Sequence, residues 1–184
     1  MAGDPSNRGD PSDPDPRDPG DPGDDVDRLV AAWRRERPEL DVRPMEVLSR
    51  VTRLARHLDR ARREAFAGHA LQPWEFDVLS ALRRSGPPYH LSPGLLLRAT
   101  LVTSGTMTNR VDRLALRGLV ERLPDPTDRR GVLVRLTDTG RAAVDAALDA
   151  LLERERDLLD GLQPQDSHRL AGLLRVLTTS FDAP

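Results

Sequence analysis

The sequence contains no cysteine. This absence excludes disulfide bonds, thiolate catalysis, cysteine-based redox sensing and zinc sites with cysteine ligands. Lysine is absent too, so every basic side chain is an arginine, whose planar guanidinium suits bidentate contacts to phosphate and guanine. Aromatic residues make up only 3% of the chain, and aliphatic side chains must therefore fill the core. Because leucine and alanine dominate and favour helices, we expect a mainly α protein.

Long apolar runs are also missing. No stretch approaches the roughly 18 residues that a membrane-spanning helix needs, and the N-terminus lacks the apolar core of a signal peptide. We therefore expect a cytoplasmic protein that does not associate with membranes.

Patterns typical of enzymes are weak or absent. The four histidines show no ligand spacing with one another or with carboxylates, so no metal site is predicted (His57, His69, His90 and His168). Asp138-Thr139-Gly140 matches the aspartic-protease tripeptide, but it occurs once and lies at a helix start, where Thr137 and Asp138 complement free backbone amides. No glycine-rich phosphate loop follows a strand. The sequence therefore predicts neither an enzyme nor a bound cofactor.

The N-terminal segment, residues 1–25, repeats Asp-Pro and Pro-Gly with almost no apolar content, which predicts a disordered tail. Residues 1–27 hold nine Asp and two Arg, a net charge of −7, so the overall −2 leaves the remainder at +5. A solvated tail is the simpler interpretation of this segment. The alternative is an acidic arm that competes with DNA for a basic surface.

The rest of the chain divides into three expected parts. N-terminal helices are predicted in residues 26–69, at 27–36 and 44–68, and two long amphipathic helices in residues 138–184, at 138–162 and 164–181. Between them, residues 70–137 contain predicted helices at 73–84, 93–98 and 104–117. The helical spacing of apolar residues then ends. Residues 119–123 and 132–136 are predicted to form the two strands of a β-hairpin around a polar turn.

Helices followed by a two-stranded hairpin are typical of a winged helix-turn-helix, a DNA-binding fold. The third helix of the unit carries short polar and bidentate donors suited to phosphate and base edges, whereas Met107, Val111 and Leu114 are expected to face inward. Eight arginines against four acids between Arg98 and Arg135 make the segment basic. The predicted DNA-binding residues in the helices are Ser92, Ser104, Thr106, Thr108, Asn109 and Arg113.

The stretch SGTMTNRVDRLALRGLVERLPDPTDRRGVLVRLTDTG resembles the MarR family of bacterial transcription regulators. The resemblance implies that Arg130 enters the minor groove, with Arg129 beside it and Asp128 as its orienting partner. It also implies a homodimer built from residues 44–60 and 145–184, whose apolar stripes an isolated winged helix would leave unburied. Such a dimer would bind a pseudopalindromic double-stranded operator, in this family usually as a repressor.

The segment WEFDVLSALRRSGPPYHLSPGLL and the additional N-terminal helix look like the urate-responsive PecS/HucR branch of that family. The resemblance assigns a urate or purine site to Trp33, Asp77, Arg110 and Arg122. An indole can stack on a planar anion and a guanidinium can hold its charge. An Asp77–Arg110 pair in the empty protein would be weakened by the anion, and the recognition helix would shift.

Two other functions stay open. The same crevice could bind a phenolic or other lipophilic acid, which ligand screening by thermal shift would distinguish from urate. If no small molecule altered its DNA affinity, the protein would instead be an architectural DNA-binding protein.

Overall fold

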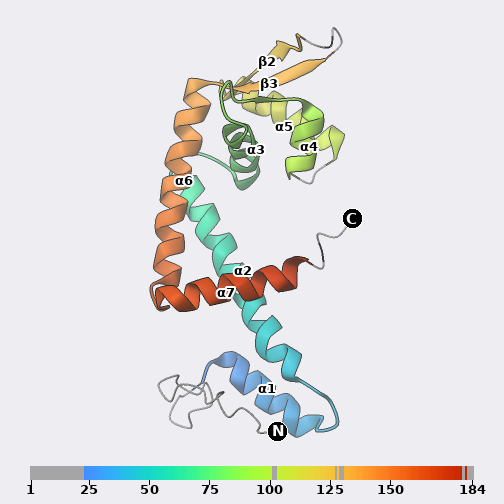
Figure 1. The fold of residues 1–184 in the computed structure, drawn as a ribbon, viewed down its shortest axis with the longest axis vertical. Helices are drawn as coiled ribbons and strands as arrows, with labels where there is room; N and C mark the ends of the chain where they lie inside the picture. Colours follow the sequence, from blue (N-terminus) through green and yellow to red (C-terminus); the bar gives the residue numbers. More distant parts are fainter. Residues whose placement is uncertain (1–22, 101–102, 127, 129–130, 180, 182–184) are drawn as a thin grey trace, which may run out of the picture. The chain divides into compact units, whose positions relative to one another are not determined.

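The computed structural model describes residues 23–100, 103–126, 128, 131–179 and 181 (Figure 1). The predicted acidic tail therefore lies outside the described residues, except for its last three positions. The chain divides into two compact units, Met1–Arg56 and His57–Pro184. Among the described residues, no helix is long and apolar enough to cross a membrane.

The first unit contains α1 (Asp25–Glu36) and the N-terminal half of α2 (Arg43–Ala67). Helix α1 begins two residues earlier than the sequence predicts, because Asp24 caps it: the Asp24 carboxylate accepts from the backbone amides of Val26 and Asp27 at 2.7 and 3.0 Å. Val26 and Val30 form a small apolar cluster with Val42.

The second unit contains the winged helix, with α3 (Pro73–Arg84), α4 (Pro93–Thr100) and α5 (Ser104–Leu116) followed by β2 (Val120–Pro124) and β3 (Val132–Leu136). A two-residue strand, β1 (His90–Leu91), completes an antiparallel sheet of order β1-β3-β2. The hairpin register runs from Val120 opposite Leu136 to Pro124 opposite Val132. The mainly α winged-helix fold is thus confirmed.

One continuous core holds this unit together. Side chains of α3, α4, α5, β2, β3 and α6 (Asp138–Leu159) pack around Leu79, Leu82, Leu96 and Val134, all of which are fully buried. On the outer side of α3, Phe66 of α2 stacks on Phe76 with ring centres 4.1 Å apart. Helices α3, α4 and α5 are therefore fixed against the sheet and α6.

The start of α6 makes the closest backbone approach in the unit. The Thr137 hydroxyl accepts from the Gly140 amide at 3.0 Å, which confirms the predicted helix cap. A Cβ at Gly140 would lie only 2.0 Å from the Leu119 carbonyl oxygen, so glycine is required there. The Asp138-Thr139-Gly140 tripeptide therefore has a structural role as a helix start packed against the end of the α5–β2 turn.

Helix α7 (Pro164–Thr179) follows α6 and has no buried residue. Its apolar side chains, Leu173, Val176 and Leu177, are exposed, as are Leu158 and Leu159 in the second half of α6. The amphipathic pattern predicted from the sequence is thus present, and the described residues leave several side chains on its apolar side exposed.

Candidate functional site

Helix α5 presents one apolar and one polar face. Met107, Val111 and Leu114 are 0–2% exposed, as their helical spacing predicts. The other face exposes the five predicted DNA-binding side chains of this helix: Ser104, Thr106, Thr108, Asn109 and Arg113. This polar face has the donors and the charge that a nucleic acid requires.

An ion pair between an exposed arginine and a buried carboxylate joins the C-terminal end of α5 to the start of α3. Arg117, the C-cap residue of α5, donates from Nη1 to Glu75 Oε2 at 2.6 Å and from Nη2 to the Ala70 carbonyl at 2.8 Å. The Glu75 side chain is only 3% exposed and also accepts from the Gln72 amide at 2.8 Å. The contact fixes the end of the exposed helix to the first turn of α3.

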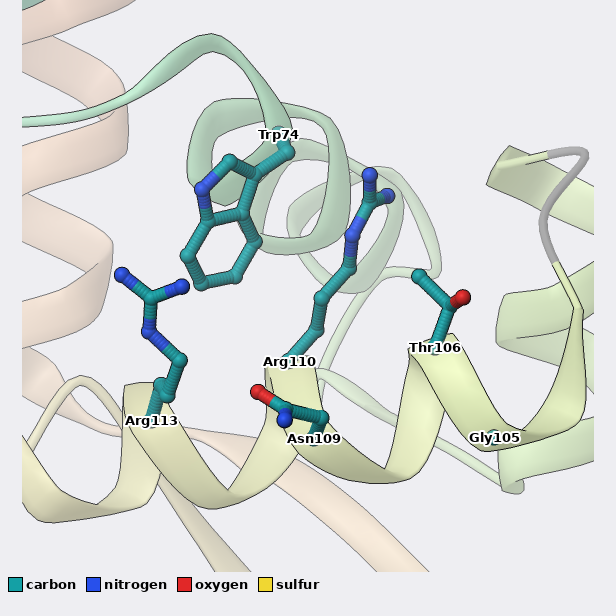
Figure 2. A pocket seen from close by; sticks show the side chains of 6 residues that line it. All are labelled: Trp74, Gly105, Thr106, Asn109, Arg110 and Arg113. Carbon is teal, nitrogen blue, oxygen red and sulfur yellow. The ribbon is translucent and has the colours of Figure 1, made fainter.

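A pocket of about 450 Å³ lies between α5 and the first turn of α3 (Figure 2). The Trp74 indole lies beside two guanidinium groups, with the Arg113 and Arg110 Cζ atoms 4.9 and 5.5 Å from the ring centre. Gly105, Thr106 and Asn109 complete the lining. Two cations, one aromatic ring and two polar side chains therefore line one open recess.

Two backbone hydrogen bonds close the polar turn of the hairpin. The Asp125 amide donates to the Gly131 carbonyl at 3.0 Å, and the Gly131 amide donates to the Asp128 carbonyl at 2.8 Å. Arg129 and Arg130, the predicted groove-contacting pair, lie outside the described residues. Ser92, the remaining predicted contact, caps α4, with its Oγ 3.4 Å from the Leu95 amide.

Arg122 connects the hairpin to α5. Its Nη2 lies 2.8 Å from Asp112 Oδ1, so the ion pair joins β2 to the exposed helix. Arg122 also lines a second pocket of about 230 Å³, which is otherwise largely apolar and includes Pro93, Met107, Thr108, Val111, Val132 and Val134. One cation in an apolar recess suits a small anion with an aromatic or aliphatic body.

The expected Asp77–Arg110 pair is not formed. Asp77 accepts from Arg62 of α2 at 2.9 Å, and Arg110 lies over Trp74 instead. The Arg62 guanidinium is held there because its Cζ also lies 5.4 Å from the centre of the Phe66 ring. The structure therefore gives Asp77 an ion pair with Arg62 and Arg110 a ring contact with Trp74, so the switch predicted for this pair needs another basis.

Trp33 belongs to the first unit, where it lies on α1 and is 43% exposed. Helix α1 is bonded to α2 by arginines: Arg50 donates to Asp27 at 2.7 Å and Arg53 donates to Asp25 at 2.6 Å. The hydrogen bonds from these arginines hold the pKa of each aspartate below its ordinary value. Ionic contacts thus position the helix that carries Trp33.

Trp74 is a site residue that was not predicted from the sequence. Its half-buried ring instead faces Arg110 and Arg113, which are three residues apart and so share one side of α5. An aromatic residue in the first turn of α3 gives no sequence signal for this contact.

No cluster of three or more histidine or acidic residues in the described part of the chain could hold a metal ion.

Residues 70–131 match the model of the MarR family. The chain is 39% identical over 150 residues to the HTH-type transcriptional regulator PecS of Dickeya dadantii, covering 82% of this chain and 90% of PecS. It is 33% identical over 145 residues to the HTH-type transcriptional repressor NicR of Pseudomonas putida, covering 77% and 90%.

A solved structure extends this similarity to a DNA complex. The C80S mutant of Escherichia coli MarR bound to operator DNA superposes with a TM-score of 0.62 at 28% sequence identity. The match covers 75% of this chain and 99% of that one. The similarity therefore extends well beyond the helix-turn-helix.

Proposed function

The chain belongs to the MarR family, and we propose that it is a homodimeric transcription repressor that releases its operator on binding urate or a related purine. The observation that carries the proposal is α5, whose inner face is buried in the winged-helix core and whose outer face exposes hydroxyls, an amide and Arg113. Short polar side chains and arginine are the groups that read base edges and phosphates in a major groove.

For the DNA surface, we propose Ser92, Ser104, Thr106, Thr108, Asn109 and Arg113 in the helices, and Asp128, Arg129 and Arg130 in the wing. The helices would contact the major groove, and Arg130 would contact the adjacent minor groove, where arginine is favoured by the negative potential. The likeness to a MarR protein bound to operator DNA supports this placement.

DNA binding is tested by selecting duplexes from a random library with the full chain and measuring affinity by fluorescence anisotropy at several salt concentrations. Replacing Arg113 or Arg130 with alanine should weaken binding and lower the salt slope by about one, because each removes one phosphate or groove cation. Arg84→Ala is the matched control, since Arg84 is exposed and, among the described residues, bonds only Ser80 on its own helix. Equal salt slopes in all four proteins would refute the assignment.

The homodimer is supported by apolar side chains that the single chain leaves exposed. They lie on α2, on the second half of α6 and on α7, the regions that the sequence assigns to dimerisation: Val47, Leu48, Val51, Leu54, Leu158, Leu159, Leu173, Val176 and Leu177. Exposed apolar residues at helical spacing on three helices are typical of an obligate interface.

Light scattering at micromolar concentration should give twice the mass of one 20.4 kDa chain. Leu173→Glu combined with Leu177→Glu should shift the protein toward the monomer, because two charges would be buried in the interface. Leu116→Glu is the control, since Leu116 is 88% exposed but lies on α5. A monomeric wild-type protein would contradict the proposal.

For the effector, we propose a site built around Arg122; of the other residues that the resemblance assigns to it, Asp77 and Arg110 belong to the same unit and Trp33 to the first unit. Arg122 is the residue with the clearest role, because its present partner is Asp112 of α5 at 2.8 Å. An anion bound to Arg122 would compete with Asp112 for the guanidinium and loosen α5 from the hairpin. This exchange supplies the differential contact that a ligand needs to shift the DNA-binding conformation.

A phenolic or other lipophilic acid is the alternative effector, favoured by the apolar lining of the pocket beside Arg122. Thermal shift measurements with urate and with hydroxybenzoate distinguish the two, because a ligand stabilises the folded state that binds it. Urate should raise the melting temperature of the wild type and have less effect on Arg122→Ala. A shift with hydroxybenzoate alone would favour the alternative, and no shift with either would favour a ligand-blind architectural protein.

A further inference from the structure

The first turn of α3 is a rigid base for Trp74. Pro73 begins the helix, the Glu75 carboxylate accepts from the Gln72 amide, and the same carboxylate is paired with Arg117. The indole is therefore carried by a turn that is bonded to the C-cap residue of α5. The Glu75–Arg117 ion pair fixes this turn to the C-terminal end of α5. The contacts of the Trp74 ring with Arg110 and Arg113 fix the indole farther along the same helix.

Arg110 and Arg113 contact the Trp74 ring rather than a carboxylate. Among the described residues neither is paired with a carboxylate, whereas Arg62, Arg117 and Arg122 each are. The Cζ atoms of Arg113 and Arg110 lie 4.9 and 5.5 Å from the centre of the same indole ring. Two positive charges therefore lie close to one ring. In Figure 2 the indole lies between the two arginine side chains, and Thr106 lies on the far side of Arg110.

We infer that Trp74 is a positioning residue of the DNA-binding surface, whose indole orders Arg110 and Arg113 so that both contact DNA backbone phosphates. This inference rests on the proposed function and gives a DNA contact to Arg110, which the sequence resemblance assigned to the effector site. Both guanidinium groups line an open recess with the hydroxyl of Thr106 and the amide of Asn109, which are phosphate and base donors. An uncompensated pair of cations in such a recess is complementary to an anion.

Preordering matters because a free arginine side chain loses considerable rotamer freedom when it binds. The indole restricts both side chains before DNA arrives, so less freedom is lost on binding. The energy of two cation–π contacts at exposed sites, roughly 5- to 30-fold as an equilibrium constant, is the upper limit of what this preordering can add to DNA affinity. Trp74→Leu should therefore weaken DNA binding by up to this factor, although it removes no charge from the protein.

The salt dependence separates positioning from general destabilisation. Each phosphate contact contributes about 0.9 to the slope of log affinity against log salt concentration. If Trp74→Leu releases the arginines from their phosphates, the slope falls by about one to two. A tryptophan that served only packing would change affinity without changing this slope.

The experiment uses the full chain and a duplex that the wild type enriches from a random library. Anisotropy titrations over a range of salt concentrations compare the wild type with Trp74→Leu, Trp74→Phe, Arg110→Ala/Arg113→Ala and the triple variant. We expect a reduced slope in Trp74→Leu, an intermediate one in Trp74→Phe, which keeps a ring, and no further loss when Trp74→Leu is added to the double variant. Circular dichroism verifies that each variant folds. If Trp74→Leu does not fold, Trp74→Met replaces it in the same measurements.

A wild-type salt slope in folded Trp74→Leu or Trp74→Met would overturn the inference while leaving the proposed function intact. An additional affinity loss in the triple variant would also overturn it, because Trp74 would then act without the arginines. A wild-type protein that enriches no duplex would overturn the proposed function and the inference together.

Discussion

Replacing Arg117 with alanine should destabilise the protein more than replacing its partner Glu75 with glutamine. The two side chains differ in burial: Glu75 is 3% exposed and Arg117 is 40% exposed. Without Arg117, the backbone amide of Gln72 is the one donor that the described residues still offer to the buried carboxylate. With glutamine at position 75, Arg117 can return to water and the neutral amide can still accept a hydrogen bond.

The magnitudes follow from this asymmetry. Removing one partner of a buried ion pair costs about 3–5 kcal/mol, and the partial exposure of Arg117 favours the lower end, about 3 kcal/mol. Glu75→Gln loses the charge but leaves no buried ion, so about 1 kcal/mol is expected. For a chain of this size, each kcal/mol corresponds to roughly 2–4 °C in melting temperature.

Urea unfolding followed by circular dichroism measures both differences, at one fixed protomer concentration because association contributes to stability. Arg84→Ala should stay within about 0.5 kcal/mol of the wild type and serves as the surface control. The double variant Glu75→Met/Arg117→Met should recover most of the loss of Arg117→Ala, since no charge is left buried. A Glu75→Gln variant as unstable as Arg117→Ala would refute the reasoning.

Two further predictions concern other contacts. Gly140→Ala should cost roughly 1–3 kcal/mol or more, because the added Cβ meets the Leu119 carbonyl oxygen at 2.0 Å, and an unchanged urea midpoint would contradict this. Helix α1 should loosen as the pH falls below 3.8, the ordinary pKa of an aspartic acid, because the hydrogen bond from Arg53 lowers the pKa of Asp25 and its stabilising effect is lost on protonation. Trp33 emission in a Trp74→Phe variant reports the loosening, and constant emission under acid titration would count against it.

The fold followed from local signals that the sequence states clearly. The spacing of Met107, Val111 and Leu114 predicted the buried face of α5, and Thr137 predicted the start of α6. Strand β1 was missed because two residues, His90 and Leu91, show no alternation. They become a strand only by pairing with β3, which tertiary structure decides.

The ionic partners were harder to predict than the helices. Asp77 and Arg110 are plausible partners by residue type, but Arg62 reaches Asp77 from α2, where Phe66 supports it. Which arginine meets which acid depends on helix packing, and sequence spacing fixes that only within one helix. With twenty-eight arginines available, residue type alone could not identify the pair.

We propose that this MarR-family protein binds DNA and is released from it by a small planar anion. The most direct measurement is a urate titration of the complex between the full chain and its selected duplex, followed by anisotropy. The account predicts that urate releases the wild type and that Arg122→Ala, which lacks the guanidinium shared with Asp112, responds much more weakly. Release that is equal in the two proteins, or a complex that urate leaves intact, would contradict it.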